Sequence, residues 1–351
     1  MIRFIHLADV HLGAAPDAGE AWSVRREQEI WESFRRAVAL AGERKADLLL
    51  VAGDLFHRQP LVRELREVNY LFSTIPETTV VLTAGNHDYL KRDSAYLRFP
   101  WEENVIGLWG ETCESVVLPG KNVRVYGCSY HSREIRESIY DRVRPADESG
   151  IHILLAHGGD ASHAPMDYTA LRNAGFDYVA LGHIHKPQIL SGSMAYAGAL
   201  EPLDRNDTGA HGLIVGECED HRTKISFLPL AVREYKDLVI PVRKETTQFS
   251  LEKQVSYEIR QKGADHLYRI RLTGRREQGT AFLPQRLKAL GNVTQVEDET
   301  VPDFDLEQLS VRYEGTLIGE YIRYFQEKDK LTRTEEQALF YGLQAMLEEH
   351  L

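Results

Sequence analysis

The sequence ADLLLVAGDLFH at residues 46–57 carries an apolar run directly into Gly53 and Asp54. Similar runs recur before residue 190, as IRFIHLA, TVVLTA, VRVYGCS, HILLAH and DYVALG. Short runs rich in Val, Leu and Ile, mostly followed by Gly, Asp or His, are typical of strands buried on both faces. Helix-like segments at 22–44 and 61–74 separate the first three runs. The sequence therefore predicts an α/β fold, a sheet with helices on its faces.

The chain divides into three predicted regions. In residues 1–232, two β-type runs after residue 210 add a small β element to the sheet domain. Residues 233–301 combine two helix-like segments with strand-like runs, which predicts a small α+β capping domain. Residues 302–351 carry two amphipathic patterns, about 306–327 and 332–349, so a C-terminal helical hairpin is expected.

Length and composition exclude several classes of protein. With 351 residues, 43% hydrophobic and 27% charged, the chain has room for a full core and an ordinary globular composition. Asp9 interrupts the apolar start and no run approaches the length of a membrane span, so a cytoplasmic protein is expected. Cys113, Cys128 and Cys218 show no CxxC spacing, which leaves His, Asp, Glu and Asn to hold any metal.

Side chains able to bind metals follow the apolar runs. Because the carboxyl ends of the strands in an open α/β sheet meet at one edge, such side chains can converge although they are distant in sequence. The candidates are Asp9, His11, Asp54, Asn86, His157, His183 and His185. Asp54 can offer two carboxylate oxygens to two cations, so the set suits a dinuclear centre of manganese, iron or zinc. Two such ions can clamp a phosphate diester and generate a bridging hydroxide.

Most other histidines are expected to be packed or surface residues without a chemical role. These are His6, His131, His152, His163, His221, His266 and His350. Asp204 and His211, in GALEPLDRNDTGAHG, are weaker candidates for a place near the site.

Five motifs carry a family resemblance. LADVHLG, AGDLFH, GNHD, LAHG and LGHIHKPQ resemble the motifs of the calcineurin-like metallophosphoesterases, in the form found in SbcD- and YhaO-type DNA-repair nucleases. The resemblance implies the sandwich fold of that family, with mixed sheets flanked by helices, and a two-metal phosphodiesterase, usually with manganese. It further implies exonuclease or endonuclease action on DNA in repair and recombination, with an SMC-like ATPase of the SbcC type as partner.

The resemblance also implies a role for each site residue. It places Asp9, His11 and His185 on one metal and Asn86, His157 and His183 on the other, with Asp54 bridging. It implies that His87 binds the scissile phosphate or protonates the leaving oxygen while Asp88 orients it. His57 corresponds to a second phosphate-facing histidine of the nucleases and favours a diester substrate.

The charge distribution bears on the partners. The net charge is −11, and residues 303–351 account for −6 of it, so binding of DNA by overall charge is disfavoured. Local phosphate contacts could come from Arg25, Arg26, Arg35, Arg36, Arg58, Arg63 and Arg66, or these side chains could simply be solvated. The acidic, amphipathic residues 302–351 are expected to dock the ATPase; the alternative is that the two helices only cover each other's apolar stripes. Whether the chain forms a homodimer stays open.

Two alternatives to a nuclease stay open. One is a phosphodiesterase or phosphatase for a small nucleotide substrate, against which His57 and the additional C-terminal regions argue. The other is a scaffold subunit without chemistry, which would be expected to lose metal ligands, whereas all seven are present. The leading hypothesis is that residues 1–232 cut DNA and residues 233–301 cap or guide it.

Overall fold

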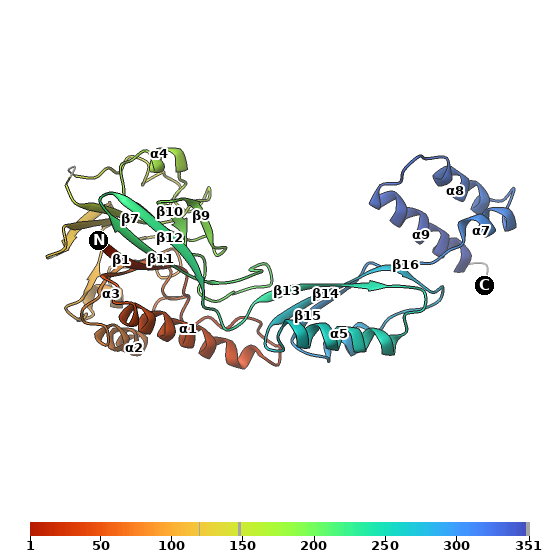
Figure 1. Cartoon of the computed structure of the whole chain (residues 1–351), viewed down its shortest axis with the longest axis horizontal. Helices are drawn as coiled ribbons and strands as arrows, with labels where there is room; N and C mark the ends of the chain where they lie inside the picture. The colour runs from red at the N-terminus through yellow and green to blue at the C-terminus, as the bar shows by residue number, and fades with distance from the viewer. Residues whose placement is uncertain (119, 147–148, 349–351) are drawn as a thin grey trace. The chain divides into compact units, whose positions relative to one another are not determined.

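The computed structural model describes residues 1–118, 120–146 and 149–348, and these residues form two compact units (Figure 1). The first unit is Met1–Glu234 and the second is Tyr235–Leu351. Of the histidines named above, His350 lies outside the described residues. Within the described ranges, no helix combines the length and the apolar character that crossing a membrane demands.

The first unit contains two six-stranded sheets. The first sheet has the order β12-β11-β1-β2-β3-β4, in which β1 to β4 are parallel and β11 pairs antiparallel with β1. Its strands are β1 Ile2–Leu7, β2 Leu48–Ala52, β3 Thr79–Thr83, β4 Val105–Gly107, β11 Gly212–Glu219 and β12 Arg222–Pro229. Helices α1 Ser23–Glu43 and α2 Val62–Ser73 pack on its outer face, and the short α3 Ala95–Arg98 follows β3.

The second sheet has the order β5-β6-β7-β8-β10-β9, with β6, β7, β8 and β10 parallel. Its strands are β5 Glu114–Leu118, β6 Val123–Gly127, β7 Ile151–His157, β8 Tyr178–Gly182, β9 Gln188–Ser191 and β10 Met194–Tyr196; α4 Tyr168–Arg172 precedes β8. One buried cluster contains Leu48 and Leu50 of the first sheet and Ile153 and Leu155 of the second, so the sheets face each other across a common core. The predicted α/β fold of mixed sheets flanked by helices is confirmed. The continuous apolar runs are explained because the strands they form, β1, β2, β3, β6, β7 and β8, are largely buried on both faces.

The second unit begins with a parallel sheet. Strands β13 Tyr235–Val242, β14 Leu267–Arg276 and β15 Val293–Asp298 pair in that order, and the short β16 Val301–Pro302 also pairs with β14. Helices α5 Gln248–Lys262 and α6 Pro284–Lys288 cover one face. On the other face alternate residues of the strands reach solvent, and Val239 is 57% exposed.

The C-terminal part contains three described helices rather than the two predicted. They are α7 Leu306–Arg312, α8 Leu317–Gln326 and α9 Arg333–Glu348. The prediction of one helix over 306–327 was wrong because the chain turns at Gly315, where φ is +73°, and Thr316 caps α8 by accepting a hydrogen bond from the Gly319 N–H. The predicted stripes pack on one another, since Ile322, Phe325, Leu339 and Leu343 share one buried cluster.

Candidate metal centre

The structure brings all seven predicted metal ligands to one edge of the two sheets. Residues 9 and 11 follow β1, residue 54 follows β2 and residue 86 follows β3 in the first sheet. His157 ends β7, and residues 183 and 185 follow β8 in the second sheet. The site therefore lies where the carboxyl ends of strands from both sheets meet.

One cluster contains Asp9, His11 and His185. Each offers a ligand atom, and these atoms lie within 4.8 Å of one another. The rings of His11 and His185 are 5.1 Å apart between centroids. Among the described residues, His11 Nε2 is buried without a hydrogen-bond partner, which is the state of an imidazole nitrogen whose lone pair is kept for a metal.

The second cluster contains Asn86, His157 and His183. The Asn86 Oδ1 atom lies 2.9 Å from His157 Nε2 and 3.1 Å from His183 Nδ1. An amide oxygen and two imidazole nitrogens are a donor set that divalent first-row metals accept.

Asp54 lies between the two clusters. Its Oδ2 atom is 3.7 Å from His11 Nε2 and 3.5 Å from His157 Nε2. Its Oδ1 atom accepts a hydrogen bond of 2.8 Å from the His87 backbone N–H, which fixes the carboxylate in place. One carboxylate thus faces a histidine of each cluster.

The backbone at the site adopts conformations that side chains other than glycine rarely take. Asp9, His11, Asp54 and His183 have φ angles of 49°, 53°, 50° and 95°. The backbone turns at these residues, which follow strands β1, β2 and β8. Residues held in this region cost of order 1–3 kcal/mol each and cluster at functional sites.

Glycines leave room for the clustered side chains. A Cβ atom at Gly85 would lie 2.2 Å from Asp54 Oδ1 and 2.7 Å from His157 Nε2. Gly53 has φ +83°, and a Cβ there would lie 2.4 Å from His157 Nδ1. Both motif glycines are therefore required by close approach to the ligands.

Three of the candidate ligand histidines have an acceptor behind the ring. His157 Nδ1 lies 2.9 Å from the Ala52 carbonyl oxygen, His183 Nε2 lies 2.7 Å from Asp160 Oδ2, and His185 Nδ1 lies 3.2 Å from Asp207 Oδ2. Since a carbonyl or carboxylate oxygen only accepts, each of these nitrogens donates, and in the neutral ring the opposite nitrogen is the one that can offer a lone pair to a cation. Such backing groups orient metal-binding histidines.

The two carboxylates that contact His183 and His185, those of Asp160 and Asp207, were not predicted from the sequence. Asp160 follows His157 by three residues in HGGD, and Asp207 lies in the segment from which Asp204 and His211 were singled out. His163 was expected to have an ordinary structural role, but its Nδ1 atom lies 3.0 Å from the Asp160 carboxylate and its ring 4.4 Å from that of His183. His211 is buried, with Nδ1 3.1 Å from the Gly209 carbonyl oxygen.

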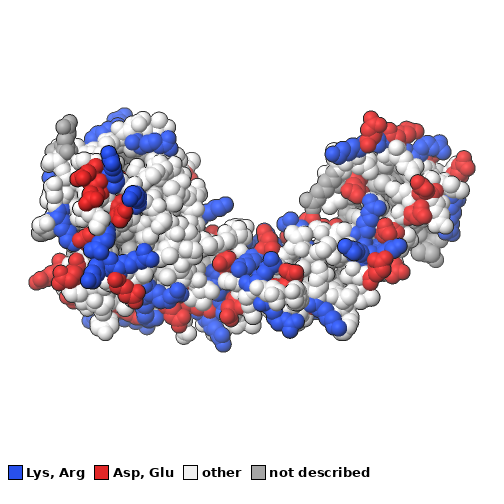
Figure 2. All heavy atoms as spheres, in the orientation of Figure 1, with Lys and Arg blue, Asp and Glu red and all other residues white. Residues whose placement is uncertain are grey.

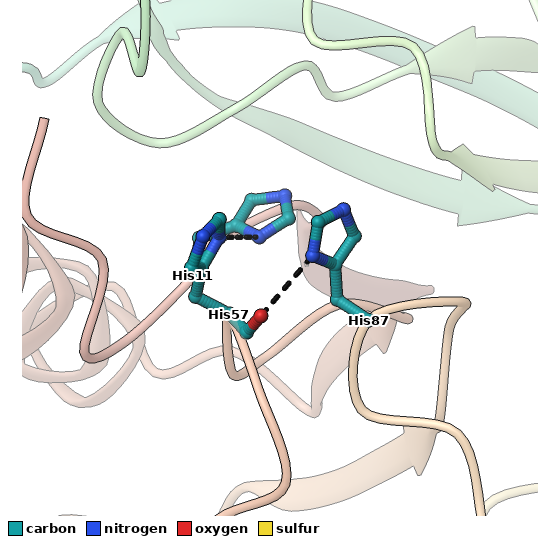
Figure 3. Close-up of side chains that lie close together, drawn as sticks. All are labelled: His11, His57 and His87. Carbon is teal, nitrogen blue, oxygen red and sulfur yellow. Dashed lines mark hydrogen bonds between the residues drawn. The ribbon is translucent and has the colours of Figure 1, made fainter. Parts of the chain in front are cut away.

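His87 and His57 are exposed and lie beside His11 (Figure 3). The His87 and His57 rings stack with centroids 5.0 Å apart. His87 Nδ1 lies 3.1 Å from the His57 carbonyl oxygen and therefore donates to it, which leaves His87 Nε2 as the nitrogen available for proton transfer. His57 Nδ1 lies 3.3 Å from His11 Nδ1, so this ring contacts a candidate ligand.

The role predicted for Asp88 was wrong. Asp88 is fully buried and accepts hydrogen bonds from the Gly85 N–H, the Phe56 N–H and the Tyr96 hydroxyl, at 2.8, 3.1 and 2.8 Å. It thus ties the loop after β3 to the loop after β2. The group that orients the His87 ring is the His57 carbonyl.

Burial and neighbouring charges shift the pKa values in the cluster. Burial raises the pKa of Asp9 to about 6, against the opposing effect of His157 and His185. Burial also acts on Asp54, but His157 and His11 outweigh it and hold the pKa of this carboxyl far below its usual range. Burial lowers the pKa of His157, but Asp54 raises it to about 9. Asp54 is therefore the permanent negative charge around which cations would gather.

The arginines proposed for phosphate contacts are mostly engaged within the protein. Arg26 is fully buried, bonded to Glu29 and to the Pro202 carbonyl oxygen, so its prediction as a DNA contact was wrong. Arg35 is paired with Glu67, Arg58 makes two hydrogen bonds to Glu64, and Arg36 bonds the Leu230 carbonyl oxygen, whereas Arg25, Arg63 and Arg66 are exposed. On the face drawn in Figure 2, basic and acidic side chains are interspersed in both units.

Comparison with known proteins shows the family. A family model described as calcineurin-like phosphoesterase matches residues 2–187. The chain is 29% identical to the uncharacterized metallophosphoesterase YhaO of Bacillus subtilis over 231 residues, which cover 60% of this chain and 56% of YhaO. It is 29% identical to the DNA double-strand break repair protein Mre11 of Methanocaldococcus jannaschii, covering 59% of this chain and 58% of that protein. For Mre11 of Haloferax volcanii the identity is 26%, and the coverage is 73% and 60%. The chain thus spans little more than half the length of these relatives.

Proposed function

The chain belongs to the calcineurin-like phosphoesterase family, and on that premise we propose that it is a two-metal-dependent DNA nuclease. The observation that carries this proposal is the position of Asp54, whose Oδ2 atom faces both His11 Nε2 at 3.7 Å and His157 Nε2 at 3.5 Å. A carboxylate shared in this way is what a pair of cations requires as a bridge. Similarity to proteins named for DNA double-strand break repair supports DNA as the substrate.

The two clusters would each hold one metal ion. We assign one ion to Asp9, His11 and His185, the other to Asn86, His157 and His183, and Asp54 to both. Bound there, the ions would neutralise the phosphate and supply a nucleophile at neutral pH. Imidazole, carboxylate and amide donors without thiolate suit manganese, iron or zinc. Of these we propose manganese, the metal that the family resemblance implies.

His87 is the proposed general acid. Its Nδ1–H is held by the His57 carbonyl oxygen at 3.1 Å, and the side chain is exposed, so Nε2 can deliver a proton to the leaving oxygen. We assign His57, which is also exposed, to contact with the phosphate. Asp88 holds the two loops together and takes no direct part in this scheme.

Exposed cations on the loops of the site are the proposed DNA contacts. Lys91 and Arg92 follow the GNHD motif, and Lys186 follows His185 directly; all three are exposed. They replace the buried Arg26 as candidates for holding phosphates. If Lys186 contacts a phosphate, Lys186→Gln should weaken binding of all sequences and reduce the slope of log affinity against log salt by about one.

The sheet of the second unit is the proposed DNA guide. Its uncovered face carries Arg269, 2.7 Å from Asp237, and Arg271, 3.4 Å from Glu297. These ion pairs are partly exposed to solvent, where such pairs contribute only about 0–1 kcal/mol, so a phosphate can take the place of the carboxylate. Residues 233–301 would thus offer a row of arginines to the DNA backbone.

The helices α7 to α9 are the proposed docking site for an SMC-like ATPase of the SbcC type. Their apolar stripes form a buried cluster, yet Val311, Leu317 and Tyr324 remain 76%, 77% and 59% exposed. Exposed apolar side chains on helices that already have a core suit a protein partner, and the charge of −6 over residues 303–351 disfavours DNA there.

A surface substitution tests the docking proposal. Leu317→Asp should abolish co-purification with the ATPase while leaving metal-dependent cleavage of short single-stranded DNA unchanged. Phe249→Asp, at a side chain of α5 that is 64% exposed, is the matched control and should leave the complex intact. If the Leu317→Asp variant binds the ATPase with the affinity of the parent, the docking site lies elsewhere.

The nuclease proposal is tested by cleavage of labelled DNA. Manganese should support hydrolysis of single- and double-stranded oligonucleotides, and a chelator should abolish it. Nucleotide esters are the comparison substrates. If the protein hydrolyses a nucleotide ester but cleaves no oligonucleotide, the nuclease proposal is wrong and the protein is a phosphodiesterase for small molecules.

A further inference from the structure

We propose that Asp160 and Asp207 are positioning residues that impose opposite tautomers on His183 and His185, and so assign these two nearby histidines to different metal ions. This inference rests on the proposed metal centre. It explains how one short sequence, GHIH, can serve two clusters at once.

The contacts of His183 fix its tautomer. Nε2 lies 2.7 Å from Asp160 Oδ2, while Nδ1 lies 3.1 Å from Asn86 Oδ1. Both oxygens only accept, but the Asp160 carboxylate is charged and nearer, so the single proton of the neutral ring is on Nε2 and the lone pair is on Nδ1. That lone pair points to the cluster formed with Asn86 and His157.

The contacts of His185 are reversed. Here Nδ1 lies 3.2 Å from Asp207 Oδ2, which places the proton on Nδ1. In the neutral ring the lone pair is then on Nε2 and is available to the cluster formed with Asp9 and His11, and the ligand atoms of these three residues lie within 4.8 Å of one another. The two histidines therefore use different nitrogens.

The loop that carries Asp160 is built to hold this carboxylate. Gly158 and Gly159 have φ angles of +144° and +124°, and a Cβ atom at Gly158 would lie 2.4 Å from the His163 carbonyl oxygen. The Asp160 Oδ1 atom accepts from the Ser162 and His163 N–H groups at 2.8 and 3.0 Å. His163 Nδ1 lies 3.0 Å from Oδ2, the same oxygen that faces His183.

This arrangement makes asparagine a severe substitution at position 160. The amide oxygen is required by the Ser162 and His163 N–H groups, so the NH₂ group must face His183 Nε2. Two donors cannot bond to each other, and the conflict is removed only when His183 moves its proton to Nδ1. The lone pair is then on the wrong side, and Asp160→Asn should weaken metal binding more than Asp160→Ala does.

The same substitution should be mild at position 207. Asp207 Oδ2 accepts from the Leu203 N–H at 2.9 Å and the Asp204 N–H at 3.3 Å, besides facing His185 Nδ1. One amide oxygen can keep all three contacts, so Asp207→Asn loses only the charge. Asp207→Ala removes the acceptor and should be the more severe of the two.

Calorimetric titration of the full chain with Mn²⁺ tests the assignment. His183→Ala and His185→Ala serve as references that mark which binding step belongs to which histidine. Asp160→Asn should weaken the His183 step by about 10- to 100-fold, and Asp207→Ala should do the same to the His185 step. Asp207→Asn should stay within a few-fold of the parent.

Nitrogen-15 NMR of the metal-free histidines gives a readout that a purely structural role would not change. At a pH where both rings are neutral, Asp160→Asn should move the His183 proton from Nε2 to Nδ1, and Asp207→Asn should leave the His185 proton on Nδ1. The proposal would be overturned by any one of three results. These are an unchanged His183 tautomer in Asp160→Asn, a smaller loss of Mn²⁺ affinity with asparagine than with alanine at position 160, and equal weakening of both Mn²⁺-binding steps. A parent that binds two Mn²⁺ ions but cleaves no DNA would refute only the nuclease, and a parent that binds none would refute the metal centre.

Discussion

Gly85→Ala isolates the steric requirement of the metal centre. Gly85 has no φ in the left-handed region, so alanine fits the backbone, and the effect comes from the added methyl group alone. That methyl carbon would lie 2.2 Å from Asp54 Oδ1 and 2.7 Å from both Asp54 N and His157 Nε2. Two of these three atoms belong to groups assigned to metal binding.

The required displacement sets the magnitude. Ordinary contact begins at 3.4 Å, so Asp54 Oδ1 would have to move by about 1.2 Å and the other two atoms by about 0.7 Å. Metal–ligand distances tolerate only about 0.2 Å, so the displacement exceeds the tolerance several-fold. Overpacking of this kind costs about 1–3 kcal/mol, equivalent to a fall in Tm of about 2–12 °C for a unit of this size.

Gly192→Ala is the matched control. A Cβ at Gly192 meets nothing within 4 Å, and its φ also lies outside the left-handed region. Metal analysis after dialysis and thermal unfolding should show that Gly85→Ala loses both metal equivalents and melts lower, whereas Gly192→Ala behaves as the parent. If Gly85→Ala keeps two tightly bound equivalents of metal, then Asp54 and His157 are not metal ligands in the positions described here.

Three other outcomes follow from the same geometry. Asp54→Ala should lose both metals at once, because its carboxylate faces a histidine of each cluster; one equivalent bound as tightly as in the parent would contradict the bridge. His87→Asn should keep both metals and slow cleavage by about 10²–10⁴, and a metal-depleted variant would instead make His87 a ligand. For His157 and His185, burial lowers the pKa, but nearby carboxylates raise it to about 9 from 6.5. Their protonation stabilises the metal-free fold below about pH 6.5, and this stability is lost as the pH rises to about 9. The Tm of the metal-free protein should therefore fall over this range while its affinity for Mn²⁺ rises. A Tm that rises instead would show that these histidines are not protonated in the fold.

The sheets and the convergence of the candidate ligands could both be predicted from the sequence, because an apolar run followed by a polar residue indicates both. A strand buried on both faces is a continuous apolar run, and the polar residue that ends it must lie at the edge of the sheet. Asp54 after LLLVAG and His157 after HILLA are examples. The information is local, and parallel pairing then brings distant segments to one edge.

The groups behind the histidines were not predictable in this way. Asp160 reaches His183 and Asp207 reaches His185 only through loop conformations that depend on tertiary contacts. Asp88 shows the opposite error, since adjacency in sequence suggested that it orients His87, whereas its carboxylate turns into the core to bond Phe56 N–H and the Tyr96 hydroxyl. Neighbouring residues at a sharp turn point in different directions, so proximity in sequence is a poor guide there.

Backbone strain gives a last, independent reason to treat this edge of the fold as a functional site. Asp9, His11, Asp54 and His183 all have positive φ, and none of them is a glycine. At about 1–3 kcal/mol each, such strain persists only where the surrounding contacts over-determine the backbone. Here the contacts are visible: both Asp9 carboxylate oxygens accept from the His183 N–H at 3.0 and 2.9 Å, and Asp54 Oδ1 accepts from the His87 N–H at 2.8 Å. The strained backbone therefore lowers the stability of the fold, but it holds carboxylate and imidazole groups together before any cation binds. Because these groups are already in place, metal binding needs less reorganisation, and a preorganised centre binds its ions more tightly for that reason.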